Sequence, residues 1–178
     1  SGNVSVSGLD ISRSGRELLV SYESDQIYSF PILPESTSPA GPTLDDIDKA
    51  SATLLNDKDA YTSELASYGG HLNRFTFLKN AKYAGPKDDY IITGSDSGNA
   101  WIYERKSGSV VSLLSADSST CNGIVAHPTL PFFITYGIDS TAKLWRAAPC
   151  VEPRLSDSPA RRAEALLLSR RPMTDLAV

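Results

Sequence analysis

The chain of 178 residues carries a formal net charge of −4, and no basic stripe along it favours the phosphate contacts that drive nucleic-acid binding. No apolar run approaches the about 18–20 residues that a membrane span needs. The two cysteines, Cys121 and Cys150, show no spacing typical of a disulfide framework or a zinc site, so neither metal nor cofactor is expected. A reducing compartment, the nucleus or the cytoplasm, is the expected location.

Strands and turns alternate from the beginning of the chain. Val4–Ile11 is read as a strand and is followed by a turn at Ser14-Gly15. Glu17–Ser21 and Gln26–Phe30 are rich in β-branched and aromatic residues, which predicts two further strands. The polar residues Tyr22–Asp25 between them predict a hairpin tip.

Residues 31–60 interrupt this pattern with a low-complexity run rich in Pro, Ser, Asp and Ala. Val20 precedes Thr93 by 73 residues, which exceeds the repeat of 42 described below by 31. Loop entropy grows slowly with length, so an insertion of this size is tolerated. We expect it on the surface and mobile, either as a binding or phosphorylated loop or as a spacer. Tyr61–Tyr68 then returns as an outer strand.

A second unit is centred on Tyr90–Glu104, YIITGSDSGNAWIYE, which is read as two strands joined by the polar turn Ser95–Asn99. Glycine and asparagine tolerate positive φ in such turns, so this segment is a strong hairpin signal. Asn73–Tyr83 precedes the hairpin as the innermost strand, and Ser109–Leu114 follows it as the outer strand. The composition of Gly85–Asp88 predicts a turn.

A third unit follows the polar crossover Ser115–Thr120. Cys121–Ala126, Phe132–Tyr136 and Thr141–Trp145 predict three strands, and no fourth strand is expected after them.

The composition changes again in residues 147–178, which we expect to form a mostly disordered tail. Prolines prevent regular structure in its first half, while Ala160–Arg171 predicts one short helix that ends before Pro172. Five arginines stand against two acidic residues between positions 154 and 171, a local charge of +3. The tail is interpreted as a nuclear-localisation signal or a docking helix, or alternatively as a solvated, frayed end.

The hairpins recur at a fixed spacing. Thr93 precedes Thr135, and Tyr103 precedes Trp145, by the same 42 residues. Units of ~40–45 residues with two hairpins each are typical of four-stranded propeller blades. The sequence therefore predicts an all-β fold, a partial β-propeller of about three antiparallel four-stranded blades in residues 1–146. Three blades cannot close a ring, because propellers have ~4–8 of them, so we expect the C-terminal blades of a larger propeller.

Gly70-His71 before the second unit and Leu144-Trp145 at the end of the third resemble the GH and WD landmarks of WD40 repeats. In those repeats the histidine bonds a Ser or Thr on the second strand and an Asp in the following turn, beside an aromatic residue of the third strand. Asp96 lies one position before the usual turn aspartate. The resemblance implies a structural blade network of five residues: His71, Thr93, Tyr103, Asp139 and Trp145.

Blade-entry loops and the turns between second and third strands share one rim of such a scaffold, where recognition residues collect. Arg74 is the strongest anchor candidate on this rim, and the alternative is that its polar residues are merely solvated. A catalytic dyad of His71 and Asp96 is not expected, because no nucleophile or second base accompanies it. The residues predicted to bind protein on the rim are Asn73, Arg74, Asp96, Ser97 and Asn99.

A more specific resemblance rests on GGHLNRF, GPKDD, GSDSG and CNGIVAHPTLPFFITYGIDSTAKLW, which occur in this order. Together they resemble the last blades of the cullin-4-associated WD40 substrate receptors, over about Gly8 to Trp145 without the insertion. The resemblance implies a seven-bladed propeller that acts as a non-enzymatic interaction module. It also implies binding to the adaptor and cullin of a RING ubiquitin ligase, to which the propeller presents a protein substrate.

Two departures from this family concern the adaptor. Its members contact the adaptor through a W-D-x-R ending of the third strand, which neither Tyr103–Lys106 nor Trp145–Ala148 copies. Adaptor docking is therefore expected to rely on other blades or not to occur. Two other functions stay open: a WD40 scaffold of another multiprotein complex, which shares only the fold, and a hydrolase built on the blades.

Overall fold

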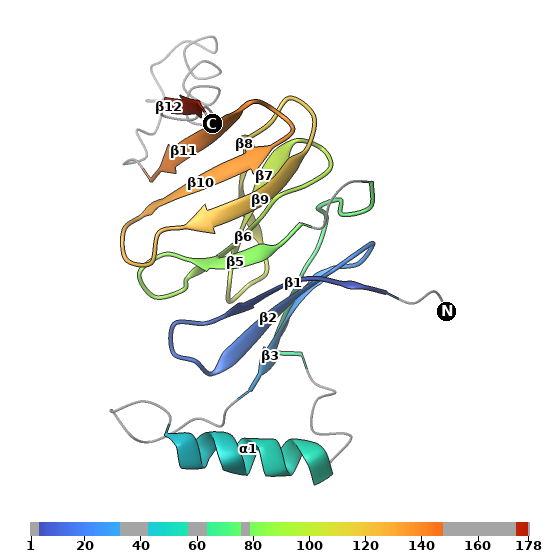
Figure 1. The fold of residues 1–178 in the computed structure, drawn as a ribbon, viewed down its shortest axis with the longest axis vertical. Helices are drawn as coiled ribbons and strands as arrows, with labels where there is room; N and C mark the ends of the chain where they lie inside the picture. Colours follow the sequence, from blue (N-terminus) through green and yellow to red (C-terminus); the bar gives the residue numbers. More distant parts are fainter. Residues whose placement is uncertain (1–3, 33–42, 57–63, 76–78, 148–173, 178) are drawn as a thin grey trace.

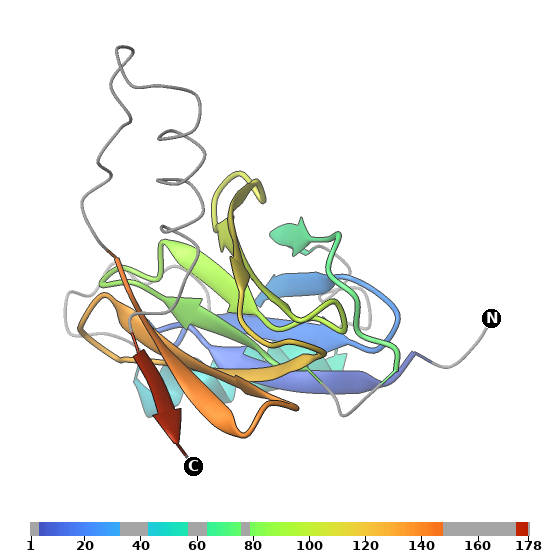
Figure 2. The same cartoon turned by 90° about the horizontal axis from the view of Figure 1, so that it is seen from above.

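The computed structural model describes residues 4–32, 43–56, 64–75, 79–147 and 174–177. Three four-stranded antiparallel sheets stand side by side, as two views of the ribbon show (Figures 1 and 2). The strands of each sheet pair in chain order, from an innermost to an outermost strand. This arrangement confirms the predicted fold class, an all-β partial propeller of three blades.

The three blades share this order of strands. Blade 1 consists of β1 (Val6–Ile11), β2 (Glu17–Tyr22), β3 (Ile27–Pro31) and β4 (Ala66–Tyr68). Blade 2 consists of β5 (Ala81–Ala84), β6 (Tyr90–Thr93), β7 (Asn99–Glu104) and β8 (Val110–Ser115). Blade 3 consists of β9 (Cys121–Ala126), β10 (Phe132–Gly137), β11 (Thr141–Arg146) and β12 (Thr174–Ala177).

The prediction that blade 3 lacks a fourth strand is wrong. The strand β12 pairs antiparallel with β11, with Thr141 opposite Ala177 and Leu144 opposite Thr174. The strand has only four residues, and two of them are polar, so its sequence alone does not indicate a strand. It forms because the open edge of β11 provides a pairing partner. The predicted helix at 160–171 lies outside the described residues.

The sequence analysis did not predict α1 (Leu44–Asn56), which lies within the insertion. Thr43 and Asp46 cap its first turn reciprocally. The Asp46 carboxylate accepts from the Thr43 backbone N–H at 2.9 Å, and the Asp46 N–H donates to Thr43 Oγ1 at 3.3 Å. Figure 1 shows α1 beyond β3, on the side of blade 1 away from blade 2. The helix therefore leaves the stacking of blade 1 on blade 2 uninterrupted.

The blades pack through their innermost strands and their apolar faces. The strand β1 contacts β5, and β5 in turn contacts β9. The core between blades 1 and 2 consists of buried residues from both sheets: Leu19, Ile27, Tyr68, Ala81, Tyr83, Ile91 and Tyr103. The core between blades 2 and 3 is built in the same way: Ala84, Ile92, Ala100, Leu114, Ala116, Cys121, Ile124 and Trp145. Burial of these residues from both sides holds the sheets together.

A close backbone contact at the junction of blades 2 and 3 allows this packing to be tested by a single substitution. Ser95 bridges to Cys121, whose backbone N–H donates to the Ser95 carbonyl at 3.1 Å. A Cβ added at Gly94 would overlap the carbonyl oxygen of Cys121, which is backbone and cannot move aside. We expect Gly94→Ala to lower the free energy of unfolding by about 1–3 kcal/mol, measured by urea denaturation.

Gly69→Ala is the matched control for this substitution. Its Cβ would meet only the flexible side chain of Gln26, 3.2 Å away, so little loss of stability is expected. Equal stability of the two variants would contradict the described junction.

Candidate protein-interaction rim

The loop that enters blade 2 is tied to the turn between β6 and β7. The Leu72 backbone N–H donates to Ser95 Oγ at 3.0 Å, and the Asp96 N–H donates to the Leu72 carbonyl at 2.9 Å. These two bonds run in opposite directions across the rim. They fix the position of residue 72 relative to the turn.

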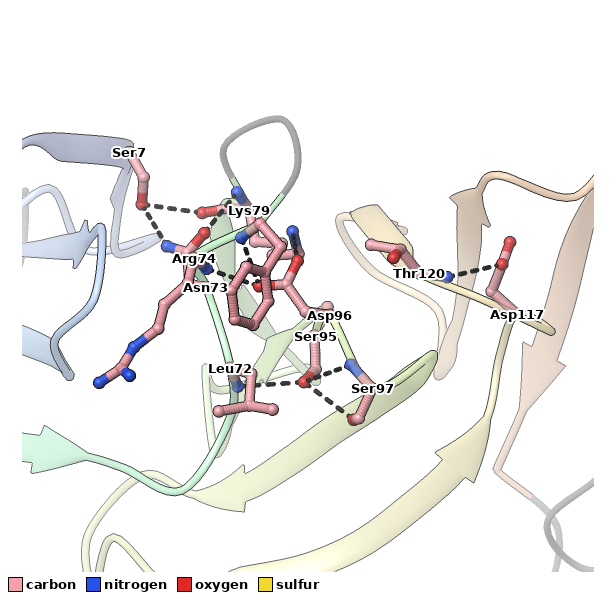
Figure 3. Close-up of polar contacts among 12 residues, drawn as sticks. Ser7, Leu72, Asn73, Arg74, Lys79, Ser95, Asp96, Ser97, Asp117 and Thr120 are labelled. Atoms are coloured by element: carbon pink, nitrogen blue, oxygen red, sulfur yellow. Dashed lines mark hydrogen bonds and ion pairs between the residues drawn. The ribbon is translucent and has the colours of Figure 1, made fainter.

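The carboxylate of Asp96 holds the loop at Arg74 and Phe75 (Figure 3). Its Oδ2 accepts from the backbone N–H groups of Arg74, at 2.5 Å, and Phe75, at 3.0 Å. Its Oδ1 forms an ion pair with Lys79, and the two side chains are only 4% and 0% exposed. Burial alone would raise the pKa of Asp96, but hydrogen bonds from Arg74, Lys79 and Phe75 keep that pKa below its usual value.

The clamped loop presents its side chains to solvent. Phe75 is 78% exposed and Leu72 is 43% exposed, while Arg74 between them is exposed as well. Figure 3 shows the Arg74 guanidinium directed away from the cluster around Asp96. Aromatic and arginine side chains are enriched in protein interfaces and often carry much of the binding energy. Because the backbone is already fixed, a partner would meet a loop whose ordering cost is small.

Two of the five predicted rim residues have another role. Asn73 is 3% exposed, and its side-chain amide donates to Ser7 Oγ and to the Tyr22 carbonyl, both at 2.9 Å. It therefore joins blade 2 to blade 1 and cannot meet a partner. The carboxylate of Asp96 is also covered and acts by positioning the loop.

The remaining predicted rim residues lie at the surface. Ser97 is exposed and bonds Ser95 Oγ at 2.9 Å, and the half-buried Asn99 donates to Ser97 Oγ at 3.2 Å. Ser97 belongs to the β6–β7 turn that carries Asp96, and Asn99 is the first residue of β7. Together with Arg74 they make up the part of the predicted rim that is open to a partner.

The structure brings together only part of the predicted histidine network. His71 Nδ1 and Tyr103 Oη share a hydrogen bond of 3.3 Å, and Tyr103 Oη also donates to the Gly69 carbonyl at 3.0 Å. Thr93 Oγ1 instead donates to carbonyls of Asn80 and Gly94, both at 3.2 Å. The carboxylate of Asp96 is occupied by the loop, and among the described residues His71 Nε2 is buried without a hydrogen-bond partner.

Blade 3 repeats the clamp with different residues. Asp139 accepts from the Ser118 backbone N–H at 3.1 Å and from the Ser118 hydroxyl, and Lys143 donates to it at 2.7 Å. These bonds, led by that from Lys143, lower the pKa of Asp139 to about 2. Asp117 adds a second link, since it accepts from the Asp139 N–H and the Thr120 N–H, both at 2.9 Å. An aspartate thus ties the entry loop to the turn in both blades.

The predicted aromatic partner in blade 3 lies in the core. Trp145 Nε1 donates to Thr135 Oγ1 at 2.9 Å, and both side chains are buried. The contact links β11 to β10 within the blade, so it is structural. Sequence reasoning singled out Trp145 but did not identify Lys79, Ser95 or Ser118 as positioning residues, because their roles depend on partners more than fifteen residues away.

The part of the chain that the structure describes contains no group of three or more His, Cys, Asp or Glu side chains arranged to hold a metal ion. Burial lowers the pKa of His71 to about 4, and the nearby charge of Asp96 opposes that shift. The imidazole of His71 is therefore uncharged near neutral pH. No helix in the described ranges is long and apolar enough to cross a membrane.

Comparisons with known proteins agree with this architecture, although no family model matches the chain. It is 38% identical over 82 residues to WD and tetratricopeptide repeats protein 1 of Homo sapiens, covering 46% of the chain and 12% of that protein. It is 34% identical over 88 residues to DDB1- and CUL4-associated factor 6 of Homo sapiens, covering 49% of the chain and 10% of that protein. The chain therefore spans only a small part of these curated relatives.

A solved structure gives the same fold at low identity. The Cps50 (Swd1) β-propeller domain of Myceliophteria thermophila superimposes with a TM-score of 0.54 at 17% identity. The match covers 80% of this chain and 38% of that one. The chain is thus similar to WD repeat proteins and forms part of a β-propeller.

The buried ion pair generates a first prediction for the rim. Asp96→Asn would leave the buried Lys79 ammonium without its carboxylate, so we expect the free energy of unfolding to fall by about 3–5 kcal/mol in chemical denaturation. Asp89→Asn, at an exposed position in the same blade, is the control and should cost less than about 0.5 kcal/mol. Similar losses in both variants would contradict the clamp.

His71 generates a pH dependence. Between pH about 6.5 and about 4 the unfolded chain binds a proton at this histidine and the folded chain does not, so the free energy of unfolding falls as the pH falls. The loss should approach about 3 kcal/mol and level off below the folded pKa. His71→Gln should flatten this part of the curve of unfolding free energy against pH. His127→Gln, which removes the only other histidine of the chain, is the control, and an unchanged curve in His71→Gln would contradict a buried neutral imidazole.

Proposed function

We propose that the chain is a non-enzymatic protein-interaction module of a WD40 propeller, and that this propeller is a substrate receptor of a cullin-4 RING ubiquitin ligase. The observation that carries the proposal is the clamped loop, which exposes Leu72, Arg74 and Phe75 while its backbone is held by Asp96. The similarity to a relative named as a DDB1- and CUL4-associated factor supports the ligase part.

A hollow beside the loop adds a receiving surface. It has a volume of about 190 Å³ and lies between the β2–β3 turn of blade 1 and the entry loop of blade 2. Its lining includes Ser24, Asp25 and Gln26 on one side and His71, Leu72 and Arg74 on the other. A partner side chain can enter the hollow beside Arg74, while the exposed Phe75 contacts the partner from outside.

The described blades supply the substrate side of the proposed receptor. The third-strand endings of blades 2 and 3 lack the family's W-D-x-R pattern, and Arg105 near one of them is engaged in an ion pair with Glu17. We therefore assign the adaptor contact to other blades of the full-length protein. The proposed location of the ligase is the nucleus and the cytoplasm.

The same missing endings favour a second candidate function. A WD40 scaffold of another multiprotein complex would use the same rim without any ligase adaptor. The two candidates differ in whether the adaptor and cullin are bound.

Affinity purification of the full-length protein from cells separates the two candidates. The ligase proposal predicts stoichiometric recovery of a cullin and its propeller adaptor, quantified by mass spectrometry. Recovery of a stable complex that contains neither protein would overturn the ligase role and leave the scaffold role.

The rim itself is tested by two substitutions of exposed residues. We expect Arg74→Glu or Phe75→Ser to weaken binding of the co-purified substrate by at least about tenfold, because each removes an anchor side chain without altering the core. Adaptor recovery should not change. Arg13→Glu, at an exposed position on the β1–β2 turn, is the matched control. Substrate recovery that is equal in all three variants would exclude this rim.

A further inference from the structure

An apolar groove opens between blades 2 and 3, away from the rim. It has a volume of about 360 Å³ and is bordered by the β5–β6 turn at Gly85-Pro86 and the β9–β10 turn at Leu130-Pro131. These turns lie at the ends of the blades opposite to the β6–β7 turn that carries Asp96. The groove is therefore a second surface, independent of the clamped loop and of the ligase role proposed above.

The walls of the groove are the aromatic and aliphatic faces of two sheets. Ile92, Ile102 and Leu114 come from blade 2. Phe133 and Trp145 come from blade 3 and stack with ring centroids 6.3 Å apart. The indole N–H of Trp145 is already bonded to Thr135, so its ring offers only apolar surface to the groove. The volume lies within the ~300–1,000 Å³ typical of ligand-binding clefts.

The mouth of the groove leaves large apolar side chains in contact with water. Val111 is 53% exposed, Leu130 is 52% exposed and Tyr90 is 42% exposed. Such residues gathered around a hollow mark an interaction site more often than scattered ones do. The outermost strand of blade 2, β8, lies beside the groove, and among the described residues it pairs on one edge, with β7, and not on the other. Its other edge can therefore hydrogen-bond the backbone of an extended peptide.

The charge of the groove lining indicates which kind of ligand the groove can bind. Arg146 is the one charged residue in the lining, and its guanidinium forms no hydrogen bond or ion pair within the described ranges. A carboxylate is the natural complement of an arginine at an apolar site. The chain's own residues 148–173 carry five arginines against three acidic residues, so like charge disfavours them as the occupant. A single cation is also too few to hold a nucleic acid.

We infer that this groove binds an extended segment of a partner protein in which a leucine or aromatic side chain stands next to a carboxylate. The apolar side chain fills the space above Trp145, the carboxylate pairs with Arg146, and the peptide backbone lies along β8. The partner bound here is a different molecule, or a different part of one, from that bound at the rim.

The experiment selects peptides from a random library of about twelve residues on the full chain and then measures affinities. The expected selection is a leucine or aromatic residue adjacent to Asp or Glu. Binding is followed by the emission of Trp145, with Trp101→Phe as the background because the chain has two tryptophans. Thermal unfolding of every variant checks that it is folded.

Two neighbouring valines on β8 give the matched pair. Val111→Glu should weaken the selected peptide by at least about tenfold, because Val111 lines the groove. Val110→Glu places the same charge on the same strand, at a residue that is 45% exposed and does not line the groove, and should change affinity by less than about twofold. Leu130→Glu replaces Val111→Glu if the latter does not fold.

Charge reversal tests the second contact. Arg146→Glu should weaken the acidic peptide and restore binding to the same peptide with lysine in place of its acidic residue. Selection without this pattern would overturn the inference, as would affinities that Val111→Glu and Arg146→Glu leave unchanged. Displacement of the selected peptide by a synthetic peptide of residues 148–173 at comparable affinity would assign the groove to the chain itself and would also overturn it.

Discussion

A buried ion pair between Lys79 and Asp96 fixes the surface on which the proposed function depends. Removing an ammonium and a carboxylate from water is costly, and their attraction offsets that cost only when further hydrogen bonds satisfy the remaining lone pairs. Here the backbone N–H groups of Arg74 and Phe75 supply those bonds. The charge pair and the loop therefore stabilise each other, and the side chains of the loop are left free to meet a partner.

The two ends of the blades differ in the polarity of the surfaces they present. At the rim, polar contacts from Asp96 and Asp139 order the entry loops of blades 2 and 3 while side chains stay solvated. At the other end, the groove above Trp145 is apolar and carries one arginine, Arg146. A rigid stack of sheets with a polar rim and an apolar groove is suited to holding two partners at once, which is the task of a scaffold.

The repeat could be predicted from the sequence because each hairpin is signalled by residues close together in the chain, and these signals recur with the 42-residue spacing of Thr93 and Thr135. The roles of individual residues within the repeat could not be predicted. Asn73 and Asp96 are polar residues next to a turn, a pattern typical of surface residues. Both side chains are nevertheless covered, Asn73 by contacts with blade 1 and Asp96 by contacts with the loop and Lys79. Lys79 lies two residues before β5, and the sequence alone does not indicate which carboxylate it pairs with. The strand β12 needed the open edge of β11.

Amide hydrogen exchange at Arg74 and Phe75 tests the central claim most directly. Both N–H groups lie in an exposed loop, where exchange in minutes or less would be ordinary. If Asp96 holds them as described, they should exchange as slowly as amides of the adjacent strands, although the Phe75 side chain is 78% exposed. Exchange at the rate of an unstructured peptide would show that the loop is not clamped and would contradict the account of a preorganised rim.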